Sequence, residues 1–202
     1  MPKSEDWPRS RDSIFGIGNT ERFHAKMDLG SWGVYPLAYL HAAEWLVGSI
    51  DSGANPDLIV FPALYLYRHY LELALKRLIS MGCALDSTAP KCLGSHKLQE
   101  LWNEARPLIE KHTGGPDEAL EAVGTVVAEF AALDPFGEAF RYSEYKDGKE
   151  TLAGTEHVCL DEIVRVMKRV DNFLVGAESV MDELRQHQAD LEREYQKDRE
   201  CF

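Results

Sequence analysis

The sequence predicts an all-α protein: a bundle of four or five helices with one long helix at its C-terminal end. Apolar residues recur at three- and four-residue spacing along most of the 202-residue chain, which is the period of an α-helix. Convincing alternation of apolar and polar residues is missing, apart from a short hairpin pattern near 140–153. An apolar content of 45% is enough for one domain with a good core, and no uncharged apolar run is long enough to span a membrane.

The N-terminal third is expected to contain an arm and one helix. Residues 1–30 are polar without a sustained period, which predicts a flexible arm, and the helical domain is expected over 31–184. Few polar residues interrupt the segment at about 34–50, where we expect the first helix. A polar break follows it, with Asn55 placed to cap the second helix and Pro56 as its first residue.

Three further boundaries follow from capping and turn residues. The second helix is expected to run to about Met81, because Gly82 is a suitable stop. Ser95 is a suitable N-cap for a third helix over about 96–112, which carries an apolar stripe. A Gly-Gly-Pro turn then precedes a fourth helix that ends at about Leu133.

The last helix, which follows a turn at 134–137 and an irregular segment, has a heptad seam. Its first half is expected to lie along the bundle, whereas residues 185–202 outrun the other helices and are expected to project. This end could form a homodimer, bind a protein partner or fold back. The seam comprises Leu160, Ile163, Met167, Val170, Leu174, Ala177, Met181, Leu184, Gln188, Leu191 and Tyr195.

Charge and cysteine usage narrow the classes of function. The net charge of −12 argues against a protein that coats nucleic acid without specificity. Residues 56–106, however, hold six Lys and Arg against five Asp and Glu, which leaves room for a local anionic ligand. The four cysteines show no CxxC spacing and the start has no signal-peptide core, so we expect a cytoplasmic protein with reduced thiols. No spacing matches a compact metal site or a dinucleotide loop, and we expect no metal and no cofactor.

The second helix carries a row of charges on an otherwise apolar surface. Arg68, Glu72 and Lys76 follow one another at four-residue spacing, and His69 lies beside them. Buried charges are unfavourable unless they are paired. Three interpretations stay open for this row: a structural ion-pair network, contact with a ligand, or catalysis.

Three segments together resemble proteins of the HEPN superfamily. They are Arg68–Lys76, Ser95–Trp102 and Phe140–Tyr142, and the resemblance covers roughly residues 35–175. HEPN proteins are helical bundles found in bacterial toxin, antiviral-defence and RNA-processing systems. Their active members resemble one another in being metal-independent ribonucleases that dimerise. The resemblance therefore implies a homodimer that handles RNA or a nucleotide.

The sequence departs from the usual HEPN signature, an arginine followed four to six residues later by a histidine. No histidine follows Arg141 at that spacing, and the literal match from Arg106 to His112 lies at the tail of the third helix. The sequence thus leaves enzymatic activity open, and a noncatalytic protein that binds a partner through its last helix is the alternative. Candidate catalytic residues are Arg68, His69, His96 and Arg141, and candidate ligand-binding residues are Glu72, Lys76 and Tyr142.

Overall fold

The computed structural model confirms the all-α bundle with its long C-terminal helix. It describes residue 25 and residues 33–114 and 118–200, with side chains up to 198. Most of the expected arm at 1–30 therefore lies outside the described residues. The described helices are α1 (Val34–Gly48), the 3-10 turn η3 (Ser49–Ser52), α2 (Pro56–Leu85), α3 (Leu98–Thr113), α4 (Glu118–Leu133) and α5 (Leu160–Glu200).

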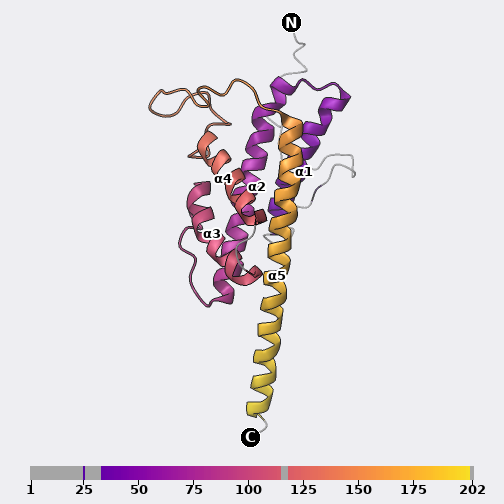
Figure 1. Ribbon diagram of the computed structural model, residues 1–202, viewed down its shortest axis with the longest axis vertical. Helices are drawn as coiled ribbons and strands as arrows, with labels where there is room; N and C mark the ends of the chain where they lie inside the picture. The colour runs from indigo at the N-terminus through magenta and orange to yellow at the C-terminus, as the bar shows by residue number, and fades with distance from the viewer. Residues whose placement is uncertain (1–24, 26–32, 115–117, 201–202) are drawn as a thin grey trace, which may run out of the picture. The chain divides into compact units, whose positions relative to one another are not determined.

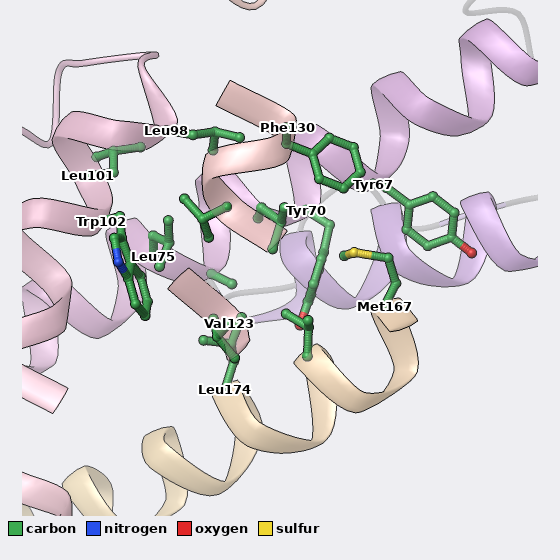
Figure 2. Packing of buried hydrophobic residues seen from close by; sticks show 14 of the residues in the cluster. Tyr67, Tyr70, Leu75, Leu98, Leu101, Trp102, Val123, Phe130, Met167 and Leu174 are labelled. Carbon is green, nitrogen blue, oxygen red and sulfur yellow. The ribbon is translucent and has the colours of Figure 1, made fainter. Parts of the chain in front are cut away.

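Helix α2 is the central element of the bundle. It packs against α1, α3 and α5, and α4 packs against α3 and α5 (Figure 1). Its side chains are apolar on nearly every face, which fits a helix with neighbours on several sides. Figure 2 shows this core, in which residues of α2 meet residues of α3, α4 and α5. Labelled there are Tyr67, Tyr70, Leu75, Leu98, Leu101, Trp102, Val123, Phe130, Met167 and Leu174.

The start of α2 was predicted correctly and its end was not. The Asn55 side chain accepts a hydrogen bond from the Asp57 backbone N–H at 2.9 Å, and Pro56 is the first helical residue. The helix continues through Gly82 to Leu85. A Cβ atom at Gly82 would lie 2.8 Å from Leu108 Cβ, so this glycine permits close packing of α2 on α3 and does not end the helix.

The expected cap of the third helix was also wrong. Helix α3 begins at Leu98 with Lys97 in the capping position, and no side chain caps it. The Ser95 hydroxyl donates to Glu100 and accepts from the Lys97 backbone N–H. Residues 95–97 therefore form a turn before the helix, which places His96 outside the helix.

Helix α5 has two parts that differ in burial. Up to Met181 its seam packs against the bundle and is buried except for the half-buried Ile163, and Tyr70 donates to Asp171 at 2.7 Å. Beyond that point Leu184, Leu191 and Tyr195 are 37%, 51% and 66% exposed. The C-terminal end of α5 thus presents an apolar stripe that no described residue covers.

The connection between α4 and α5 is irregular. Where the sequence suggested a short hairpin, the described residues form one isolated antiparallel bridge, between Glu144 and Glu150, and no longer strands. None of the helices described is long and apolar enough to cross a lipid bilayer.

Candidate functional site

Five polar side chains from three parts of the chain meet on one face of α2. Arg68, Glu72 and Lys76 come from successive turns of this helix and are buried. The turn before α3 contributes His96, and the residue that follows α4 contributes Asp134. The expected row of charges is therefore a tertiary cluster that links α2 to the segments before α3 and after α4.

The Arg68 guanidinium joins all three segments. Its Nη1 donates to Glu72 Oε2 at 3.0 Å, and its Nη2 donates to the His96 carbonyl oxygen at 2.5 Å. Its Nε lies 3.0 Å from Asp134 Oδ2, which is ion-pair distance without hydrogen-bond geometry. Only 3% of this side chain is exposed, so Arg68 positions other residues and has no surface for a ligand.

Asp134 is a member of the cluster that sequence reasoning missed. The sequence predicted only a turn at Asp134-Pro135-Phe136-Gly137. In the structure the Asp134 carboxylate is wholly buried. Its Oδ1 accepts from the backbone N–H groups of Glu138 and Ala139, so it organises the turn as well as facing Arg68. Gly137 has a φ of +78°, and a Cβ there would lie 3.3 Å from Arg68, so both backbone and packing favour glycine.

Glu72 orients the imidazole of His96. Burial raises the pKa of Glu72, but hydrogen bonds from Lys76, His96 and Arg68 outweigh that effect, so the pKa lies below its ordinary value. The carboxylate is therefore ionised and can only accept, which places the proton on His96 Nδ1, 2.8 Å from Glu72 Oε1. In the neutral ring Nε2 then carries the free lone pair.

The His96 ring lies at the surface although its partner is buried. Its side chain is 72% exposed, against 4% for Glu72. The buried charges already balance without it, because Arg68 and Lys76 oppose Glu72 and Asp134. An exposed imidazole held through Nδ1 by a buried carboxylate can accept a proton from a bound molecule.

His69 and Arg141 belong to an adjoining track of stacked groups. The His69 ring packs edge-on against Tyr39 at 4.3 Å and stacks on Tyr65 at 5.9 Å. The Arg141 guanidinium lies over the Tyr65 ring at 5.6 Å and over the Tyr142 ring at 5.3 Å. The three remaining candidate residues, His69, Arg141 and Tyr142, are thus joined through Tyr65 and Arg141.

His69 and Arg141 differ in environment. Burial lowers the pKa of His69, and the nearby positive charges of Arg68 and Lys76 add to that effect against Glu72. Arg141 is exposed and donates from Nε and Nη2 to the Gly137 carbonyl at 3.0 and 2.6 Å. The other N–H groups of its guanidinium make no hydrogen bond to any residue that the structure describes, so Arg141 can still bind an anion.

The literal arginine-to-histidine match lies elsewhere. Arg106 is paired with Glu110 and Glu121, and His112 Nε2 lies 3.1 Å from Asp86. Neither residue contacts the cluster around Glu72. Among residues 33–114 and 118–198, no group of three acidic, cysteine or histidine side chains is arranged to hold a metal ion.

Comparison with known proteins gives no relative: no family model matches the chain, and no curated protein or solved structure does. Functional conclusions therefore rest on the residues of this chain.

Proposed function

We propose that this chain is a HEPN-like, cytoplasmic protein that handles RNA, of the kind found in bacterial defence or toxin systems, and that it cleaves RNA without a metal. The observation that carries the proposal is the exposed His96 imidazole held by the buried Glu72 carboxylate. A purely structural network would not need this ring, because Arg68 and Lys76 already pair with Glu72.

We assign each chemical role to one residue. His96 Nε2 accepts the proton of a ribose 2′-hydroxyl, whose oxygen forms a bond to phosphorus while the bond from phosphorus to the 5′-oxygen breaks. The 5′-oxygen takes a proton from water, which leaves a 2′,3′-cyclic phosphate and a 5′-hydroxyl. The unpaired N–H groups of Arg141 stabilise the negative charge on the phosphorane. Arg68 and Asp134 hold the two loops in place.

A test of this proposal is cleavage of RNA by the full chain in EDTA, with an Arg141→Ala variant. We expect the cleavage rate to fall about 10²- to 10³-fold, because one donor to the developing charge is lost. Arg165→Ala is the matched control, since Arg165 is an exposed arginine on α5 that is paired with Glu162. Equal rates for wild type and Arg141→Ala, or no cleavage of a broad set of RNAs, would contradict the proposal.

A second candidate function is a noncatalytic interaction protein that dimerises or binds a partner through α5. The exposed stripe of Leu184, Leu191 and Tyr195 favours it, because isolated helix ends rarely leave such a seam uncovered. The polar cluster would then be structural. The two functions separate in the Arg141→Ala experiment, since an interaction protein would show no cleavage to lose.

A further inference from the structure

An open hollow of about 560 Å³ lies beside Arg141, between α2 and the irregular segment that follows α4. Its volume is within the range of pockets that bind small organic ligands. Two aromatic side chains at its wall, Phe61 and Tyr142, are 48% and 57% exposed. Two carboxylates, from Glu144 and Glu150, also line it. The hollow thus offers rings for stacking and acceptors for hydrogen bonds.

The hollow continues the stacked track that begins at His69. Tyr65 lies between the His69 ring and Arg141, and Arg141 in turn lies over Tyr142 at the wall of the hollow. Arg68 links His96 to the track, because it donates to the His96 carbonyl and lies against Gly137, whose carbonyl accepts from Arg141. Alternating rings and guanidinium groups are typical of surfaces that bind single-stranded nucleic acid. The track leads from His69 to the hollow.

The positions of the Glu144 and Glu150 carboxylates are electrostatically unfavourable. Glu144 and Glu150 face each other across the isolated bridge, where like charges destabilise the pairing. Neither makes an ion pair with any residue in the described part of the chain. Leu152, which also lines the hollow, has a φ of +55°, an unusual backbone conformation for a bulky residue. Strain of this kind gathers at binding sites.

We infer that the hollow binds the base of an unpaired guanine nucleotide next to the phosphate that is cleaved. Guanine alone presents two adjacent donors, N1–H and the N2 amino group, which the carboxylates of Glu144 and Glu150 can accept. Adenine and cytosine place an acceptor beside their amino group, and a carboxylate would repel it. The base stacks on Tyr142, and Arg141 lies next to its phosphate. This assignment rests on the proposed function and names its substrate class.

The test is fluorescence anisotropy of the full chain with labelled 2′-O-methyl oligouridine that carries one central guanine, adenine or inosine. These oligonucleotides lack the attacking 2′-hydroxyl and stay intact. Guanine should bind at least about tenfold more tightly than adenine, with inosine between them because it lacks the amino group. Glu144→Gln or Glu150→Gln should reduce this preference to less than about threefold.

The matched control is Glu129→Gln, which alters an exposed carboxylate of α4 outside the hollow and should keep the preference. Equal binding of guanine and adenine oligonucleotides would overturn the inference. Cleavage of unmodified RNA without base preference would overturn it too, yet would leave the proposed function in place. Tight guanine binding without cleavage would instead support the hollow and contradict the ribonuclease.

Discussion

At the scale of single residues, the cluster on α2 is a set of buried charges that compensate one another. Glu72 and Asp134 each face Arg68, and Lys76 lies 2.9 Å from Glu72. Buried ion pairs contribute little net stability when intact, but removing one partner leaves an uncompensated charge in the interior. The cluster therefore fixes where His96 lies, and it makes the fold sensitive to single changes.

Replacing Arg68 with alanine should destabilise the protein strongly. Glu72 and Asp134 would lose their common partner, so we expect the free energy of unfolding to fall by about 3–5 kcal/mol in urea titration. Arg165→Ala, which breaks an exposed pair with Glu162, should change it by less than about 1 kcal/mol. A loss for Arg68→Ala no larger than that of the control would mean that the buried network does not support the fold.

Stability should also fall in acid because of Glu72. The pKa of this carboxyl is lower in the folded protein than its ordinary value. Its contribution to the free energy of unfolding is therefore fully present above the unfolded-state pKa. The contribution is lost as the pH falls through the lowered folded-state pKa. Wild type should therefore lose stability more steeply than Glu72→Gln over that window, measured by urea unfolding at several pH values. Parallel curves for the two proteins would show that Glu72 does not titrate with folding.

At the scale of elements, the sequence was informative where local chemistry decides the outcome. The Asn55–Pro56 start of α2 and the seam of α5 were predictable, because caps and heptads act within one helix. Gly82 was misread because its role depends on Leu108, a residue of another helix. Ser95 was misread because its hydroxyl accepts from Lys97 and donates to the Glu100 side chain, and the helix begins only at Leu98.

Part of the candidate site was also predictable, because it depends on residue spacing within one helix. The charged row on α2 and the histidine before α3 could be found by spacing and by resemblance. Asp134 could not be found, because a buried aspartate in an Asp-Pro turn looks like an ordinary turn residue until Arg68 is seen beside it. The one sequence feature that bears on it is the charge of the row, where the two cations Arg68 and Lys76 share the single anion Glu72.

Two glycines in helices should respond oppositely to alanine. Gly82→Ala places a Cβ 2.8 Å from Leu108 Cβ and should lower the free energy of unfolding by about 1–3 kcal/mol. Gly176→Ala on α5 meets no atom within 4 Å and should raise it by about 0.5–1 kcal/mol. Thermal and urea unfolding of both variants test this contrast. Stabilisation by Gly82→Ala would contradict the close packing of α2 on α3.

At the scale of the whole molecule, the two parts of α5 differ in what they contact. Up to Met181 it covers the bundle, and its end presents Leu191 and Tyr195 to solvent. A second copy of the chain would offer the same stripe, and two such stripes are self-complementary around a two-fold axis. We therefore propose that two copies of the chain form a homodimer through the C-terminal ends of α5.

The double variant Leu191→Glu with Tyr195→Glu should convert the proposed dimer to a monomer, because charge would replace two of the three exposed apolar residues of the stripe. Sedimentation equilibrium gives the masses. Gln186→Glu with Gln196→Glu adds the same charge at exposed positions outside the seam and should leave the dimer intact. A monomeric wild type, or dissociation of both double variants alike, would contradict pairing through this stripe.

The measurement that tests the central claim most directly is the rate of RNA cleavage in EDTA by wild type and by His96→Gln. Glutamine can still donate to Glu72 but cannot accept the 2′-hydroxyl proton, and the exposed side chain leaves the fold intact. We predict equal free energies of unfolding and a cleavage rate about 10²- to 10⁴-fold lower for the variant. Equal cleavage rates for the two proteins would contradict the assignment of His96 as the base.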